Sequence, residues 1–203
     1  MNIAIIGATG SVGGRLTQEA LSRGHQVTAI ARKANELPAQ AGLTPVAISY
    51  TDNAALTTAI RDKDAVLLAV KFTSGDGPQI LRAVKAAHPG RLLAVGGAGS
   101  LEAKPGLDVV DTPDFPAAYK DEALAAREFL RSLRRENELD WTMISPSALL
   151  APGERTGKYR VGTDQLLVDA QGKSHISIED LAKALIDELE QPKFRRARFT
   201  VGY

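Results

Sequence analysis

Short apolar runs alternate along the chain with longer segments in which apolar residues recur at helical spacing. The apolar runs predict strands at 2–6, 26–30, 44–48, 65–70, 91–95 and 140–144. The periodic segments predict helices at 11–23, 53–61, 77–88 and 117–136. Short strands rich in Ile, Val and Leu that alternate with helices are typical of a parallel sheet covered on both faces. The pattern therefore predicts an α/β fold, a single Rossmann-type doubly wound parallel sheet with a short C-terminal extension.

Two regions depart from this alternation. Residues 97–116 are rich in glycine and proline, which predicts an irregular loop, and a long loop at the carboxyl end of a strand often covers a site. After residue 146 the pattern predicts a short hairpin around 158–169 and a last helix with Ser177 as its N-cap. We expect residues 146–203 to be a small substrate-side segment of one domain that spans residues 1–203.

A glycine-rich turn with the spacing G-x-x-G-x-x-G lies between the first predicted strand and the first predicted helix. A dinucleotide-binding turn occupies this place in a Rossmann fold, although its usual spacing is G-x-G-x-x-G. Glycine allows a sharp turn and lets the backbone approach a pyrophosphate, which the first amides of the helix bind. A glycine-rich turn that binds nothing is the alternative interpretation. We expect the dinucleotide to contact Gly7, Thr9, Gly10, Ser11, Val12 and Gly13.

The end of the second predicted strand indicates which dinucleotide is bound. NAD-binding proteins usually have an acid there, which accepts a hydrogen bond from the ribose 2′-hydroxyl. This chain has Ala31-Arg32-Lys33 instead, and the forked donors of a guanidinium match the oxygens of the 2′-phosphate of NADP. A solvated surface pair of cations is the alternative. We therefore expect Arg32 to contact the cofactor and NADPH to be preferred over NADH.

Residues at the ends of three further predicted strands should lie along the same crevice, because ligands of such sheets bind at the carboxyl ends of the strands. A tight exit from the sheet would also explain the glycines among them, and a proline at a strand end has a structural explanation too. The expected cofactor contacts at these strand ends are Val70, Lys71, Phe72, Gly96, Gly97 and Pro146.

The candidates for catalysis are few. Tyr119 begins the longest predicted helix, and short-chain dehydrogenases use a tyrosine with a lysine one helical turn later as proton donor, but Ala123 stands at that position here. We expect Tyr119 to line the pocket as the candidate catalytic residue, with simple packing as the alternative. His25, His88 and His175 have no partners at ligand spacing, so no metal site is expected, although His175 stays a candidate pocket residue.

Composition excludes several classes of protein. The chain has no cysteine, so thiol chemistry and disulfides are excluded, which fits a reducing cytoplasm. Its formal net charge is +1, which does not suggest a nucleic-acid partner. The chain carries neither a signal-peptide pattern at its start nor an apolar run long enough to span a membrane, so we expect a cytoplasmic protein without a membrane partner.

Several longer motifs together resemble one known family. They are Ile5-Ile6-Gly7-Ala8-Thr9-Gly10, Val95-Gly96-Gly97-Ala98-Gly99-Ser100, Pro152-Gly153-Glu154-Arg155-Thr156-Gly157-Lys158-Tyr159, Asp164-Gln165-Leu166-Leu167-Val168 and Phe199-Thr200-Val201-Gly202-Tyr203. With these motifs the chain resembles the NADH-flavin reductases, a family of atypical short-chain dehydrogenases near the NmrA-like proteins. The resemblance implies a Rossmann domain, a nicotinamide dinucleotide, and a flavin or quinone as hydride acceptor. The family label names NADH, whereas Arg32 favours NADPH.

Two functions remain open on these grounds. The first is an NAD(P)H-dependent oxidoreductase that passes hydride to a flavin, a quinone or a similar planar acceptor, which needs no tyrosine donor because the acceptor can take its proton from solvent. The second is a regulatory protein of NmrA-like type that senses NAD(P)(H) without turnover. A sugar-nucleotide epimerase fits less well, because it would need the tyrosine–lysine pair and a larger C-terminal lobe. A homodimer or a regulatory protein partner is compatible with either function.

Overall fold

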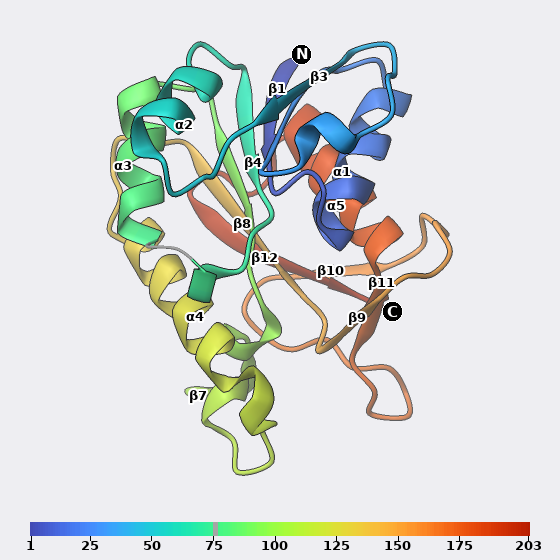
Figure 1. The fold of residues 1–203 in the computed structure, drawn as a ribbon. Coiled ribbons are helices and arrows are strands. Elements are labelled where there is room, and N and C mark those ends of the chain that lie inside the picture. Colours follow the sequence, from blue (N-terminus) through green and yellow to red (C-terminus); the bar gives the residue numbers. More distant parts are fainter. Residues whose placement is uncertain (75–76) are drawn as a thin grey trace.

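The apolar runs of the sequence form the centre of one sheet in the computed structural model, which describes residues 1–74 and 77–203. These central strands are β1 (Asn2–Ile6), β2 (Gln26–Ala31), β3 (Leu43–Ala47), β4 (Ala65–Leu68), β5 (Leu92–Val95) and β8 (Trp141–Pro146). Two further strands, β10 (Arg160–Gly162) and β12 (Ala197–Gly202), extend the sheet beyond β8. The strand order is β10-β12-β8-β5-β4-β1-β2-β3, and all neighbours are parallel except β10 and β12 (Figure 1).

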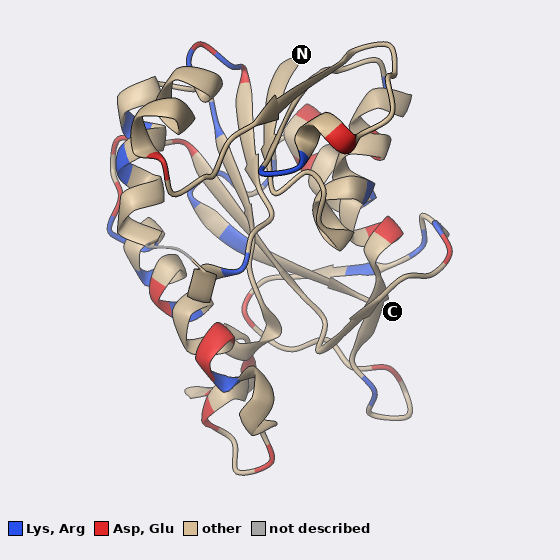
Figure 2. Cartoon of the chain, viewed as in Figure 1, with Lys and Arg blue, Asp and Glu red and all other residues tan. Residues whose placement is uncertain are grey.

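Helices cover both faces of the sheet, which confirms the doubly wound fold. One face carries α1 (Ser11–Ser22) and α5 (Ile178–Glu190), and the other carries α2 (Asn53–Ile60), α3 (Gly77–Ala87) and α4 (Lys120–Arg134) (Figure 1). Each face has its own core of buried side chains, because successive residues of a strand point to opposite sides. The strands β1, β2, β4 and β5 contain no charged residue, and Figure 2 shows the charges on the helices and connecting segments around them.

The connection order places a crevice beside β1. After β1 the chain continues to β2 and β3 on one side, and it then crosses to β4 and β5 on the other side. Ile5 of β1 is in register with Ala29 of β2 and with Leu67 of β4, so the carboxyl ends of the three strands lie at the same edge. Loops that leave this edge in opposite directions open a crevice where ligands of such sheets bind.

The hairpin expected around 158–169 is wrong. Residues 160–162 form β10, but β10 pairs antiparallel with the C-terminal strand β12, with Val161 opposite Val201. Gln165, in the expected second arm, instead forms an isolated bridge with Glu102. The sequence pattern did not predict β12 as a strand, and its pairing with both β8 and β10 outcompetes a local hairpin because it satisfies the backbone on two sides.

The expectation of an irregular loop at 97–116 is also wrong in part. This segment contains a small antiparallel sheet of β6 (Glu102–Lys104) and β7 (Leu107–Asp108), flanked by the 3₁₀ turns η3 (Ala98–Ser100) and η4 (Val109–Asp111). Gly106, with φ of +78°, makes the tight turn between the two strands.

The C-terminal part has its own short elements. The strands β9 (Leu149–Ala151) and β11 (His175–Ser177) form a second small sheet. The expected cap is confirmed, because the Ser177 hydroxyl accepts a hydrogen bond from the Asp180 N–H at 3.0 Å where α5 begins. None of the helices in the described ranges is long and apolar enough to cross a membrane.

Candidate cofactor-binding site

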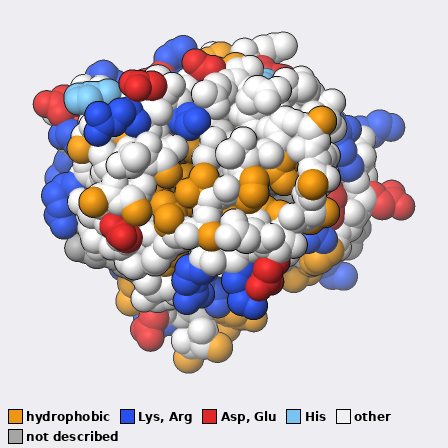
Figure 3. All heavy atoms as spheres, turned by 45° about the horizontal axis from the view of Figure 1, so that its top comes forward, with side chains coloured by type: hydrophobic (Ala, Val, Ile, Leu, Met, Phe, Trp, Pro, Cys, Tyr) orange, Lys and Arg blue, Asp and Glu red, His pale blue; other side chains and the backbone are white. Residues whose placement is uncertain are grey.

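A cavity of about 830 Å³ lies at the crevice beside β1, within the range of 300–1,000 Å³ that is usual for small-molecule and cofactor sites. Its lining comes from the carboxyl ends of β1, β2, β4 and β5 and from the segments that follow them. Figure 3 shows the hollow with apolar side chains inside it. The cavity thus lies where the glycine-rich turn and the strand ends were expected to bind a dinucleotide.

The glycines of the first turn have different roles. Gly7 has φ of +88°, and a Cβ there would lie 2.2 Å from the Ala69 carbonyl oxygen. A Cβ on Gly13 would lie 2.1 Å from the Gly7 carbonyl oxygen, so Gly13 allows α1 to pack on the turn and is not itself part of the lining. A Cβ on Gly10 would meet only the Gly7 carbonyl oxygen, at 3.2 Å. Gly10 lines the cavity, so a side chain on it would fill ligand space rather than protein.

The N-terminus of α1 is open to an anion. Gly10 is the N-cap, no side chain caps the helix, and no acidic residue lies in its first turn. The first N–H groups of a helix have no partner within the helix, and its dipole favours negative charge. Thr9, Ser11 and Val12 line the cavity beside these groups. A pyrophosphate therefore fits this turn both in space and in charge.

Arg32 lies in the lining at the end of β2 and is exposed. Its neighbour Lys33 forms an exposed ion pair with Glu36 at 3.4 Å, whereas no ion pair is found for Arg32 within residues 1–74 and 77–203. The Arg32 guanidinium therefore has its donors available, and no acid follows β2 directly. The arrangement is the one that the sequence led us to expect for a 2′-phosphate.

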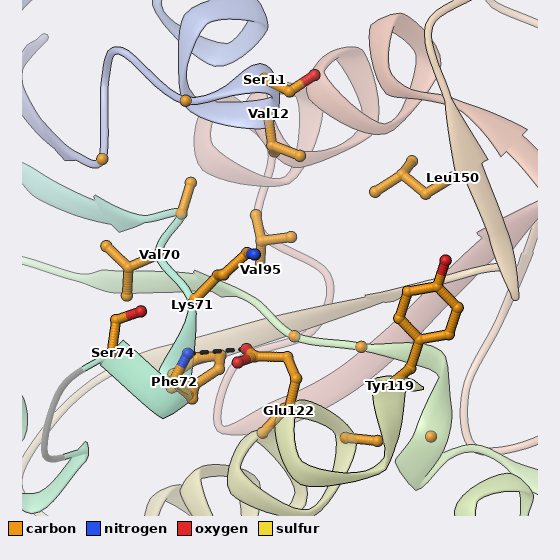
Figure 4. A pocket seen from close by; sticks show the side chains of 18 of the residues that line it. Ser11, Val12, Val70, Lys71, Phe72, Ser74, Val95, Tyr119, Glu122 and Leu150 are labelled. Atoms are coloured by element: carbon orange, nitrogen blue, oxygen red, sulfur yellow. Dashed lines mark hydrogen bonds between the residues drawn. The ribbon is translucent and has the colours of Figure 1, made fainter. Parts of the chain in front are cut away.

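The wall after β4 is held by α4 (Figure 4). Val70, Lys71 and Phe72 line the cavity, and Phe72 begins the 3₁₀ turn η2 (Phe72–Ser74). The Glu122 carboxylate of α4 accepts hydrogen bonds from the Phe72 N–H at 2.8 Å and the Thr73 N–H at 3.0 Å. It also accepts one from the Thr73 hydroxyl at 2.6 Å. Sequence reasoning missed Glu122, because its only local signal is an acid in the first turn of a helix.

Tyr50 is a second lining residue that the sequence did not indicate. It is half-buried, and its hydroxyl donates a hydrogen bond to the Lys71 carbonyl oxygen at 3.4 Å. Burial raises the pKa of the Tyr50 phenol, against the opposing influence of Ser74 and Arg32, so the hydroxyl stays a donor at neutral pH. Tyr50 and Glu122 thus hold the segment after β4 from two sides.

The glycines after β5 differ in the same way as those of the first turn. A Cβ on Gly96 would lie 2.4 Å from Met143 Cε, so a side chain there would have to displace the buried Met143 thioether. A Cβ on Gly97 would meet nothing within 4 Å, so the backbone at Gly97 is open to the cavity that both residues line. Pro146 does not join them, because it lies buried in β8 outside the lining.

The far part of the cavity is mostly apolar, and the sequence had indicated one of the two segments that form it. Val109, Thr112, Phe115 and Pro116 come from the 97–116 segment, which therefore borders the site as expected, and Ala148 and Leu150 follow β8. His175 is not in this lining; its ring packs against Tyr203 with centroids 5.1 Å apart.

Tyr119 lines the cavity from η5 (Ala117–Tyr119), just before α4, and is 68% exposed (Figure 4). Ala123, one helical turn later, also lines the cavity. The site therefore brings the candidate tyrosine to the pocket without the lysine that short-chain dehydrogenases have one helical turn later. Within the described ranges, no group of three or more His, Asp or Glu side chains could hold a metal ion.

Comparison with known proteins gives the family context. Residues 7–192 match the model of a family described as NAD(P)H-binding. The chain is also 42% identical to the uncharacterized protein YwnB of Bacillus subtilis (strain 168), over 99% of this chain and 98% of that protein.

Solved structures share the fold over nearly the whole chain. A protein from Bacteroides thetaiotaomicron named "putative epimerase" is 40% identical, with a TM-score of 0.94 over 100% of this chain and 96% of that chain. A protein from Streptococcus pneumoniae named "putative NADH-flavin reductase" is 32% identical, with a TM-score of 0.82 over 100% and 99%. A short-chain dehydrogenase/reductase from Veillonella parvula, solved in complex with NADP, shares the fold at 21% identity, with a TM-score of 0.80 over 100% and 94%. The names state different reactions, so the choice between them depends on the chemistry of the site.

Proposed function

The chain belongs to the NAD(P)H-binding family, and we propose that it is an NADPH-dependent reductase that passes hydride to a planar conjugated acceptor, a flavin or a quinone. One observation carries this proposal: a single cavity joins an anion-binding end to an apolar end that has no tyrosine–lysine pair. The anion-binding end suits the phosphates of the cofactor, and the apolar end suits a ring system that needs no acid from the protein.

The cofactor end fits NADPH through groups of two kinds. The amides at the start of α1 would hold the pyrophosphate, and the absence of a side chain on Gly10 leaves room for it. The unpaired Arg32 guanidinium would hold the 2′-phosphate through charge-assisted hydrogen bonds. The NADP complex of the Veillonella protein supports a phosphorylated cofactor in this fold, and Arg32 supports it in this chain.

The acceptor end favours a conjugated ring over a ketone. When bound, NADPH supplies hydride from its dihydronicotinamide ring; the acceptor takes the hydride and one proton from solvent, and NADP⁺ is left. A ketone would develop alkoxide charge and would need a positioned acid, whereas a flavin or quinone spreads the charge over its own ring. The chain's contribution is to orient the two rings between apolar side chains such as Val95, Phe115 and Leu150 and to exclude water around them.

The test is anaerobic stopped-flow spectroscopy of NADPH oxidation with a panel of flavins, quinones and ketones. We expect rapid loss of the NADPH absorbance with flavins or quinones, little with ketones, and none above background with a Gly10→Val variant that cannot bind cofactor. Preference for ketones, or equal rates for wild type and Gly10→Val, would overturn the proposal.

The absence of a tyrosine–lysine pair also favours a second function. A protein that senses the ratio of NADP⁺ to NADPH without turnover would also need the cofactor end and would not need a proton donor. Tight binding of both cofactor forms, without oxidation by any acceptor in the stopped-flow panel, would identify this second function.

A further inference from the structure

The charged residues of the cavity lining are divided by sign. The cations Arg32, Lys33 and Lys71 come from the segments after β2 and β4. The acids Asp114 and Glu122 come from the segment before α4 and from α4 itself. Arg32 and Lys33 thus lie where the cofactor phosphates are expected and Asp114 lies in the segment before α4, whereas the Glu122 carboxylate is bonded to the segment that carries Lys71.

We call the lining from residues 95–126 together with Ala148 and Leu150 the acceptor half. Its members are mostly apolar or glycine, and it contains no lysine or arginine. Lys120 follows Tyr119 in the chain but is not part of the lining. The acceptor half itself therefore offers a ligand no cationic side chain.

The two carboxylates of the acceptor half differ in their surroundings. Glu122 is engaged by the backbone and hydroxyl donors of Phe72 and Thr73. Asp114 is exposed beside Phe115, and no hydrogen bond or ion pair of its side chain is found in the described part of the chain. Asp114 therefore adds a carboxylate without a direct partner among the described residues to the lining of the acceptor half.

We propose that the acceptor is an uncharged planar ring, a quinone or an unphosphorylated flavin, and that Asp114 discriminates against the phosphorylated flavins FMN and FAD; this specificity rests on the reductase function proposed above. The phosphate of FMN carries close to two negative charges at neutral pH, and repulsion by one carboxylate about 8 Å away in water corresponds to roughly fivefold weaker binding. The cations do not compensate: Arg32 and Lys33 would face the phosphates of bound NADPH, and the Glu122 carboxylate lies against the segment that carries Lys71.

The test compares riboflavin, FMN and menadione, an uncharged quinone, as acceptors for NADPH oxidation by the full-length protein. We expect kcat/KM for riboflavin and menadione to exceed that for FMN by about fivefold or more at low salt, and the riboflavin–FMN difference to shrink in 0.5 M salt because charges on the surface are screened. Asp114→Lys should bring FMN to at least the level of riboflavin. Asp121→Lys, which makes the same charge change at an exposed α4 residue outside the lining, should leave the preference as in wild type.

Equilibrium binding keeps this inference separate from the proposed function. Quenching of flavin fluorescence by the NADP⁺-loaded protein measures the affinities for riboflavin and FMN whether or not either is reduced. Tighter binding of riboflavin than of FMN, reversed by Asp114→Lys, supports the inference even if no acceptor is turned over and the reductase function fails. Equal or tighter binding of FMN by the wild type, or a preference that Asp114→Lys leaves unchanged, would overturn it while rapid NADPH oxidation still supported the reductase.

Discussion

The Glu122 carboxylate accepts a hydrogen bond from the backbone N–H of Phe72 at 2.8 Å, across 50 residues of sequence. This bond joins the first turn of α4 to the segment after β4, and the pair of rings Phe72 and Phe129, with centroids 4.6 Å apart, packs beneath it. The Glu122 side chain thereby ties the segment after β4 to α4, and both elements line the cavity.

Glu122→Gln should weaken this connection. An amide keeps one acceptor oxygen but turns an NH₂ group toward donors, so we expect the free energy of unfolding to fall by about 1–3 kcal/mol. The Kd for NADPH should rise as well, since Val70 and Lys71 belong to the same segment. Urea denaturation and calorimetric titration measure the two effects, with Asp121→Asn as the control at the neighbouring exposed acid. Equal stability of Glu122→Gln and the control would mean that the hydrogen bonds between Glu122 and the segment after β4 do not stabilise the fold.

Arg32→Ala tests the choice of cofactor. Removing a charge-assisted contact usually costs about 1.5–3 kcal/mol, so NADPH should bind roughly 10- to 150-fold more weakly while NADH changes little. Lys33→Ala, which removes a cation already paired with Glu36, should have a smaller effect on the same ratio. Calorimetry with both cofactors measures the affinities, and equal weakening of NADPH and NADH by Arg32→Ala would show that Arg32 does not bind the 2′-phosphate.

Gly10→Val should separate cofactor binding from folding. Among the described residues beyond its chain neighbours, a Cβ on Gly10 would meet the Gly7 carbonyl oxygen alone, at 3.2 Å, so a small shift accommodates the Cβ, and we expect the valine methyl groups to occupy the place of the pyrophosphate. We expect a native circular dichroism spectrum and lost affinity for both dinucleotides. Gly13→Val is the matched contrast, because its Cβ would lie 2.1 Å from the Gly7 carbonyl oxygen and should reduce the melting temperature much more. Normal cofactor affinity in Gly10→Val would remove the argument from the glycine turn.

Tyr119→Phe should leave turnover nearly intact. Tyr119 is exposed and has Ala123 in place of a lysine one turn later, so it lacks the partner that would make it an acid. General acid catalysis usually contributes about 10²–10⁴-fold, whereas we expect Tyr119→Phe to keep kcat/KM for flavin or quinone within about tenfold. A loss of a hundredfold or more, with NADPH affinity unchanged, would show that Tyr119 is the proton donor.

Acid should destabilise the protein partly through Asp180. Burial raises the pKa of its carboxyl, but hydrogen bonds from Thr156 Oγ1 at 2.5 Å, the Gly157 N–H at 2.8 Å and Tyr203 Oη at 2.7 Å outweigh burial, and the net pKa is lowered. A carboxyl with a lowered pKa in the folded state stabilises the fold above its unfolded pKa of about 4, and this stabilisation is lost as the pH falls through the folded value.

The variant Asp180→Asn should therefore cost about 1–3 kcal/mol of unfolding free energy at pH 7 and progressively less below pH 4. Urea denaturation across this pH range measures the difference from wild type. Asp62→Asn, at an exposed acid, should show no such convergence. A cost for Asp180→Asn that stays constant down to pH 2 would contradict the assignment.

The sequence alone determined the features that depend on neighbouring residues. The apolar runs predicted the central strands, and the helical spacing of apolar residues predicted α1, α2, α3 and α4. The glycine-rich turn predicted the site because the sharp turn after β1 requires a positive φ at Gly7, which glycine adopts without strain. Burial and backbone conformation over a few residues leave such patterns directly in the sequence.

Only the tertiary structure decided which distant segments meet. β10 pairs with β12 instead of forming a hairpin, Glu122 reaches Phe72, and Leu150 lines the acceptor half from beyond β8. A hydrogen-bond donor or a strand edge can be satisfied by many partners, and the choice among them depends on which elements pack together and not on local preference. For this reason the cofactor end of the cavity could be predicted from the sequence, whereas the acceptor half could be predicted only in part: Gly96, Gly97, Tyr119 and the bordering 97–116 segment were expected, but Glu122, Ala148 and Leu150 were not.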